Sequence, residues 1–154
     1  MLESVFDVAD FFISKSKPKS DWAITHLKLQ KLVYYAQAWH LALYNEKLID
    51  AKFEAWVHGP VCPELYREYC HYGIDEIFIL NKSVPKNLND KTEKFLNAIW
   101  KVYGDKSGRY LETLTHDERP WKDARIGLSK DTKSNRVISE SAMAEYYSSL
   151  KGSA

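Results

Sequence analysis

The chain of 154 residues has about the length of one domain, which is enough to bury a sizeable core. Its 22 basic and 21 acidic side chains leave a formal net charge of +1, so it lacks the strong positive charge typical of proteins that bind nucleic acids or anionic membranes. No run of about 18 apolar residues occurs, and residues 1–20 lack the basic and apolar segments of a secretory signal. We therefore expect a cytoplasmic protein that does not enter the membrane.

The only two cysteines, Cys62 and Cys70, agree with this expectation. On a helix their spacing would hold them about 12 Å apart, which is too far for a disulfide bond. Free thiols are typical of a reducing compartment.

The first half of the chain predicts two helices. In residues 2–16 apolar side chains recur at helical spacing, which indicates a short amphipathic helix. The strongest helical pattern lies between Thr25, a suitable N-cap, and Asn45, a suitable stop. Its apolar side chains follow the i, i+3, i+4, i+7 rule, and we expect the other face to be solvated. That face carries Lys28, Lys31, Tyr35 and Gln37.

The stretch FEAWVHGPVCPELYREYCHYG, residues 53–73, predicts a strand, a turn and a helix. Residues 53–57 alternate apolar and polar side chains, and Gly59 with Pro60 should end that strand. Pro63 suits the first turn of the following helix, and Gly73 suits its C-cap. Residues 76–80 are either a second strand that pairs with residues 53–57 or a loop.

The second half of the chain predicts further helices. Asn89 can cap a helix that runs to Tyr103 and ends at Gly104. Two short helices should follow, one over about residues 108–114 and another opened by Pro120, and Ser139 can cap the last. We therefore predict a mainly α-helical single domain, residues 1–154, with six to seven helices and a two- to three-stranded β element near residues 53–58 and 76–80.

Several residues could carry chemistry. His58, Cys62, Cys70, His71, His116, Asp117 and Glu118 are competent metal ligands, but they form no CxxC or HExxH spacing. Cys62 lies near His58, yet no nucleophile-elbow pattern surrounds it. Lys28 and Lys31 interleave with tyrosines, as in some nucleic-acid-binding helices, but this spacing is also that of an ordinary helix face. We therefore favour a structural interpretation of each pattern.

Four separated motifs occur in a characteristic order: THLKLQKLVYYAQAWHLAL, EAWVHGPVCPELY, HYG and LTHDERPW. Together they resemble the Panacea domain, the SocA-like and phage-associated GepA-like family of small bacterial and phage proteins. The resemblance covers residues 24–121 and continues more weakly through the C-terminal helix to about residue 150. Cys62 and Cys70 do not match signature positions of the family.

The resemblance implies a mostly helical domain that acts as an antitoxin: it binds a toxin encoded beside it and suppresses that toxin. One branch of the family is similar to a proteolytic adaptor that hands the toxin to a ClpXP-type protease. Neither role needs an enzyme active site, a cofactor or a metal. Members that repress transcription tend to carry an additional DNA-binding module, which we do not find here. The sequence does not decide whether the chain forms a homo-oligomer.

Positions that match the family pattern, together with His58, Arg67 and Gly73 from the same motifs, form two groups. The expected partner-binding residues are Lys28, Lys31, Tyr35, Trp56, His58, Tyr66, Arg67 and His116. The expected structural residues are Gly59, Pro60, Gly73, Pro120 and Trp121. Two alternatives remain: a metal-dependent or nucleophilic hydrolase that uses His58 and His116, and a transcriptional regulator.

Overall fold

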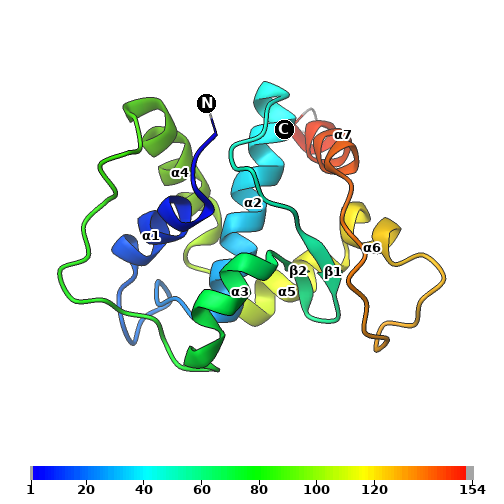
Figure 1. Cartoon of the computed structure of the whole chain (residues 1–154), viewed down its shortest axis with the longest axis horizontal. Helices are drawn as coiled ribbons and strands as arrows, with labels where there is room; N and C mark the ends of the chain where they lie inside the picture. The colour runs from blue at the N-terminus through cyan, green and yellow to red at the C-terminus, as the bar shows by residue number, and fades with distance from the viewer. Residues whose placement is uncertain (1, 152–154) are drawn as a thin grey trace.

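The computed structural model describes residues 2–151, and these residues form a mainly α-helical fold (Figure 1). The helices are α1 (Val5–Lys15), α2 (His26–Tyr44), α3 (Pro63–Tyr69), a short 3-10 helix (Cys70–Tyr72), α4 (Asp90–Tyr103), α5 (Gly108–His116), α6 (Arg119–Ala124) and α7 (Glu140–Lys151). The strands are β1 (Glu54–Trp56) and β2 (Gly59–Val61). The predicted fold class is confirmed.

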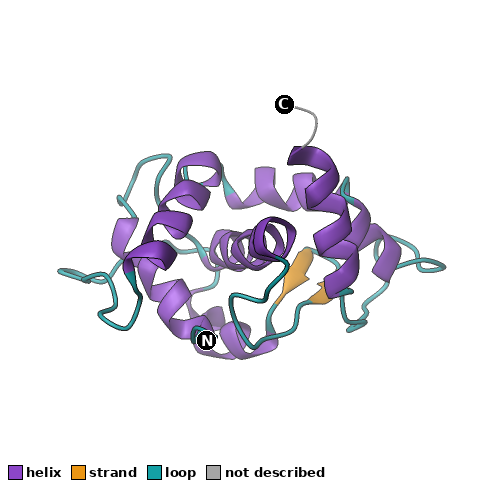
Figure 2. Cartoon of the chain, turned by 90° about the horizontal axis from the view of Figure 1, so that it is seen from above, coloured by secondary structure: helices purple, strands orange, loops and turns teal. Residues whose placement is uncertain are grey.

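Helix α2 is the centre of the fold, and Figure 2 shows it end-on with the other helices around it. Its predicted ends are confirmed. The Thr25 hydroxyl accepts a hydrogen bond from the Lys28 backbone N–H at 3.3 Å, and Asn45 ends the helix in the left-handed conformation with φ of 55°. Of the 19 residues of α2, 14 are buried, so the helix has no solvated face.

The expectation that Lys28, Lys31 and Tyr35 lie on a solvated face is therefore wrong. Their relative exposures are 2%, 0% and 0%. Apolar periodicity locates the interior only when a helix packs on one side, whereas α2 is covered all round. Its polar groups must then find partners inside the protein. The Lys28 ammonium donates to three backbone carbonyls, those of Asp21, Ala23 and Gly104.

Two glutamines of α2 hold neighbouring loops in the same way. The Gln30 side chain accepts from the Cys62 N–H at 2.8 Å and donates to the Cys62 carbonyl at 3.1 Å. The Gln37 side chain accepts from the N–H groups of Leu48 and Ile49 and donates to the Ile49 carbonyl. Each glutamine side chain thus accepts from a backbone N–H and donates to a backbone carbonyl, as a residue of a neighbouring strand does. These bonds fix the two loop segments against the central helix.

The sheet is a tight antiparallel hairpin with a turn at Val57 and His58. Gly59 and Pro60 were expected to end the first strand, but they begin the second one, with Pro60 opposite Ala55. Trp56 and Gly59 close the turn, and hydrogen-bonded and non-hydrogen-bonded pairs alternate from there. Pro60 therefore occupies a position where β1 needs no N–H from it, so the strand tolerates the proline.

Residues 76–80 were expected to be a second strand or a loop; the strand is wrong and the loop is confirmed. Glu76 makes one isolated bridge, to Thr25, and the Ile77 N–H donates to the Ile24 carbonyl at 2.7 Å. Both outer edges of the hairpin are already occupied. Residues 136–138 pair along β1, where the Ala55 N–H donates to the Arg136 carbonyl, and side chains of α2 cover β2. No edge is left for residues 76–80.

The remaining helices begin and end close to their predicted residues. Asn89 caps α4 and Gly104 ends it, while Ser139 accepts a hydrogen bond from the Ala142 N–H at the start of α7. Gly73 ends the 3-10 helix that follows α3, as expected for a C-cap. Among residues 2–151, no helix has the length and apolar character needed to cross a membrane.

Candidate functional site

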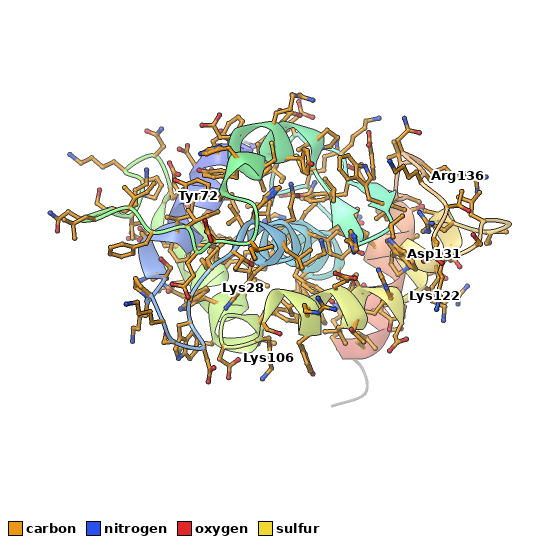
Figure 3. The ribbon with its side chains drawn as sticks, turned by 90° about the horizontal axis from the view of Figure 1, so that it is seen from below. Lys28, Tyr72, Lys106, Lys122, Asp131 and Arg136 are labelled. Carbon is orange, nitrogen blue, oxygen red and sulfur yellow. The ribbon has the colours of Figure 1, made fainter. Side chains whose placement is uncertain are left out.

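An open cleft of about 730 Å³ lies beside the hairpin. One wall is formed by the hairpin and α3, and the other by the loop between α6 and α7. Figure 3 shows that loop, which carries Asp131 and Arg136, at the edge of the molecule. The lining residues are Trp56, Val57, His58, Tyr66, Asp131, Lys133, Ser134 and Asn135. Three of the expected partner-binding residues, Trp56, His58 and Tyr66, therefore meet in one place.

Two aromatic rings, those of Trp56 and Tyr66, line the hairpin side of the cleft, and the buried His26 ring packs against Tyr66. The ring centroids of Trp56 and Tyr66 are 4.9 Å apart, and those of Tyr66 and His26 are 5.2 Å apart. Tyr66 keeps 38% of its surface exposed, whereas His26 is buried. Burial lowers the pKa of His26 to about 4, so its imidazole is neutral near pH 7. Rings with a polar tip and an apolar body are suited to protein recognition because they bury a large area with few lost rotamers.

His58 stands at the tip of the hairpin turn. Its side chain is 74% exposed, and its Nδ1 lies 3.2 Å from the Glu112 carboxylate of α5. The next residue after Tyr66, Arg67, is exposed on α3 but does not line the cleft. The cleft thus combines apolar rings with charged groups that can contact a partner at its rim.

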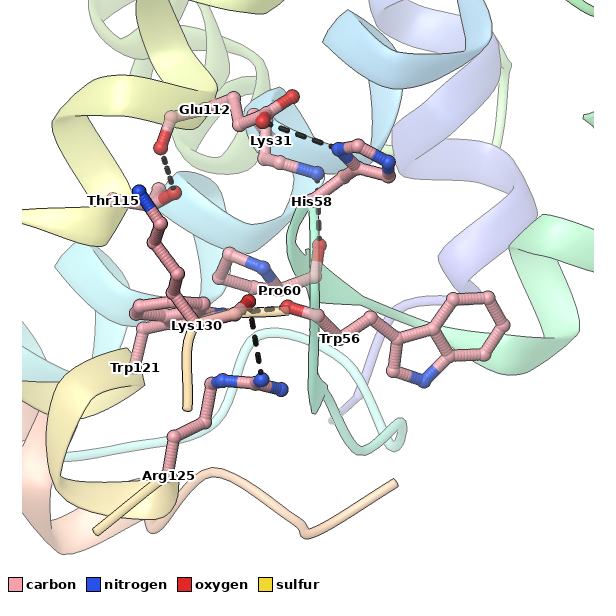
Figure 4. A network of polar contacts seen from close by, with 9 residues as sticks. All are labelled: Lys31, Trp56, His58, Pro60, Glu112, Thr115, Trp121, Arg125 and Lys130. Atoms are coloured by element: carbon pink, nitrogen blue, oxygen red, sulfur yellow. Dashed lines mark hydrogen bonds and ion pairs between the residues drawn. The ribbon is translucent and has the colours of Figure 1, made fainter. Parts of the chain in front are cut away.

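Lys31 lies beneath the hairpin and is shielded from solvent. Figure 4 shows its ammonium directed at the Pro60 carbonyl, which it reaches at 3.2 Å. Burial lowers the pKa of Lys31 to about 7, an effect that the nearby Glu112 carboxylate partly offsets. The close packing requires a glycine at position 59: an added Cβ would lie 2.6 Å from the Lys31 Cε, and φ is +107°.

Replacing Gly59 with alanine is expected to lower the free energy of unfolding by about 1–2 kcal/mol, because alanine strains the backbone and strikes the Lys31 side chain. Gly73→Ala is the matched control, since Gly73 also has positive φ, at +58°, but nothing lies within 4 Å of its Cβ position. Urea unfolding of both variants measures the difference. Equal losses in the two proteins would show that the contact with Lys31 does not matter.

His116 and Trp121 form a structural contact. Their rings stack with centroids 4.0 Å apart, and the Trp121 indole N–H donates to the Trp56 carbonyl at 2.8 Å. Trp121 is buried, and Pro120 lies in the first turn of α6. Burial lowers the pKa of His116. The half-buried His116 therefore supports the hairpin from behind.

The sequence carries no pattern that marks Arg125, yet this residue shapes the second wall of the cleft. Its guanidinium donates to the Ala55 carbonyl at 2.7 Å and to carbonyls of the following loop, those of Ser129, Lys130 and Thr132. Figure 4 shows the contact with Lys130. It also lies 5.1 Å from the Trp121 ring centroid. Its spacing of four residues from Trp121 is that of neighbours on one side of a helix, but α6 ends at Ala124, so this spacing does not single Arg125 out.

The other candidate residues lie away from the cleft. Lys28 is bonded to carbonyls near the start of α2, and Tyr35 donates to the Glu118 carboxylate in the core. The pair of lysines that suggested nucleic-acid binding is therefore not at the surface. Burial raises the pKa of the Cys62 thiol. Within residues 2–151, no group of three or more His, Cys, Asp or Glu side chains is placed to hold a metal ion.

Comparison with known proteins gives a family match. A family model described as "Antitoxin SocA-like, Panacea domain" matches residues 29–122. Antitoxin SocA of Caulobacter vibrioides is 35% identical over 81 residues, which are 53% of this chain and 42% of that protein. The match thus spans less than half the length of this relative. No solved structure is significantly similar to the chain.

Proposed function

The chain belongs to the Antitoxin SocA-like, Panacea domain family, and from this premise we propose that it binds a toxin protein in the cytoplasm and neutralises it without catalysis. The observation that carries the proposal is the open cleft lined by Trp56, His58 and Tyr66. Hot spots of protein interfaces are enriched in tryptophan, tyrosine and arginine. Arg67, the next residue of α3, is exposed outside the cleft lining, where it can contact a partner that extends beyond the cleft.

The proposed mechanism is occlusion of the surface through which the toxin acts. A part of the toxin enters the cleft between the hairpin and the Asp131 loop, where the aromatic rings exclude water from the contact. Delivery of the bound toxin to a ClpXP-type protease is the second step we propose, because occlusion alone leaves the toxin intact. Both steps use the same first contact.

The test uses the protein encoded by the adjoining gene as the toxin. Its expression alone should arrest growth, and co-expression of this chain should restore growth. Tyr66→Ala with Arg67→Ala should weaken binding between the purified proteins by about 10- to 100-fold, because it removes two anchor side chains. Isothermal titration calorimetry measures the affinity, and growth measures neutralisation.

The control is Arg109→Ala with Tyr110→Ala, which removes the same two residue types from exposed positions of α5 outside the cleft lining. This double variant should bind the toxin and restore growth as the wild type does. Normal folding and unchanged toxin binding of the Tyr66 and Arg67 variant would disprove the cleft as the binding site. Following the toxin level in cells with and without ClpX separates delivery from occlusion.

A further inference from the structure

A second groove, of about 480 Å³, lies between the last turn of α2 and the first half of α4. The hairpin and α3 lie near the start of α2, whereas this groove is at its other end (Figure 1). A helix of 19 residues is roughly 28 Å long, so the groove and the cleft do not overlap. The lining residues are Leu43, Tyr44, Lys91, Lys94, Phe95 and Ala98.

The groove has an apolar floor that reaches the surface. Leu43 and Tyr44 keep 44% and 42% of their surface exposed, although they adjoin the core. The Tyr44 ring lies 6.0 Å from the ring of the buried Phe95. On α4, Lys91, Lys94 and Ala98 follow the i, i+3, i+7 spacing of one helix face. One face of α4 thus borders the groove on one side and the last turn of α2 on the other, and apolar grooves of this kind accept amphipathic helical segments.

The rim of this groove is positively charged. The Lys91 ammonium lies 5.0 Å from the Tyr44 ring centroid, and the exposed Lys94 follows one turn later. Among the described residues, neither lysine makes an ion pair with a carboxylate. Asp90 and Glu93 belong to the same turns of α4 but do not line the groove. The charge of the two lysines is therefore available to a ligand from outside.

We propose that this groove binds an acidic amphipathic segment of a partner protein. Apolar side chains of the segment pack on Leu43 and Tyr44, and its carboxylates reach Lys91 and Lys94. This site goes beyond toxin binding at the cleft and does not depend on it. Because the two surfaces lie at opposite ends of α2, the chain can hold a toxin and a second protein at once.

Selection from a random library of peptides of about 16 residues, roughly four helical turns, tests the proposal. The wild-type chain is the bait, and the Lys91→Glu, Lys94→Glu variant removes peptides that bind elsewhere. Enriched peptides should combine leucine-like side chains at helical spacing with glutamate or aspartate. Enrichment of peptides without carboxylates, or no enrichment over the variant, overturns the proposal.

The affinity of the best peptide is then measured by fluorescence anisotropy. Lys91→Glu with Lys94→Glu should weaken binding by about tenfold or more, since two attractive contacts become repulsive. The matched control, Lys122→Glu with Lys130→Glu, makes the same charge change at exposed positions outside the groove and should bind normally. Equal weakening in both variants would show general charge attraction and overturn the site.

Two further measurements distinguish a partner segment in the groove from a second copy of the chain and from the toxin. Sedimentation velocity should give the same mass for the wild type and the Lys91 and Lys94 variant. Loss of a dimer in the variant would mean that a second copy of the chain occupies the groove, which would overturn the proposal. Toxin binding should be normal in this variant, so failure here is distinguishable from failure of the cleft.

Discussion

Glu118→Ala is expected to lower the free energy of unfolding by about 2–4 kcal/mol, one of the two largest effects we predict. Glu118 is only 6% exposed, and its Oε1 accepts hydrogen bonds from the hydroxyls of Tyr35 and Tyr147 at 2.8 and 2.7 Å. Alanine would leave two buried hydroxyls without this acceptor and would loosen α7 from α2. Release of a buried carboxylate offsets part of the loss. Urea unfolding followed by tryptophan fluorescence measures the change.

Glu118→Gln is the control because glutamine keeps an acceptor oxygen and the shape of the side chain. Burial raises the pKa of the Glu118 carboxyl, an effect that the two tyrosine hydroxyls partly offset. The stability that a raised carboxyl pKa contributes is full below the unfolded pKa and is lost as pH rises through the folded pKa. The glutamine variant should therefore gain stability relative to the wild type as pH rises above the ordinary carboxyl pKa of 4.5. A loss as large as that of alanine would contradict the acceptor role.

Lys31→Met is expected to stabilise the protein by about 2–4 kcal/mol at pH 6. Lys31 is fully buried, and its pKa falls from 10.5 to about 7. Below pH 7 the folded protein must hold a charged ammonium in its interior, which costs roughly 5 kcal/mol relative to the neutral amine. Methionine removes this cost but leaves the Pro60 carbonyl without its donor, which lowers the free energy of unfolding by about 1–3 kcal/mol.

The effect of Lys31→Met should depend on pH with a definite sign. Between the folded and unfolded pKa values the unfolded chain binds more protons, so the wild type gains stability as pH rises from 7 to 10.5. The advantage of methionine should disappear over this range. Lys101→Met, at an exposed position of α4, is the control and should show no such trend. Free energies of unfolding at pH 6, 8 and 10 test the prediction. A difference between the wild type and the Lys31→Met variant that does not change with pH would refute it.

The sequence predicts the helices well because the interactions that begin and end each helix involve only residues close together in the sequence. Thr25, Asn45, Asn89 and Ser139 act through their own side chains or their own backbone angles, and these effects need no knowledge of the rest of the fold. Gly104 ends α4 at the expected residue for the same kind of reason. The mainly α-helical class follows from these boundaries and from the apolar spacing between them.

The environment of α2 could not be predicted in this way. Lys31 and Gln37 have the residue types of a solvated face, and only the neighbours that surround the helix make them internal. The prediction that Gly59 and Pro60 end the first strand was wrong for a related reason. Pro60 is a strand terminator by local rules, but its place opposite Ala55 needs no N–H, and that register is a property of the pair.

The candidate site was predicted in part. Trp56, His58 and Tyr66 were singled out from the family motifs, and the structure brings them together at one cleft. Lys28 and Tyr35 were grouped with them but lie inside the protein. The loop that forms the second wall carries no apolar pattern, and its position depends on Arg125, which contacts it only after folding.

Arg125 holds this loop in a conformation that does not depend on the side chains of the loop. Its guanidinium bonds to main-chain oxygens of Ser129 and Thr132, which every amino acid supplies, and it makes no hydrogen bond to the side chains of residues 131–135. Those side chains can therefore diverge between related proteins while the wall stays in place. One scaffold can in this way accept a new partner by changing a few loop residues, without altering the packing around the central helix.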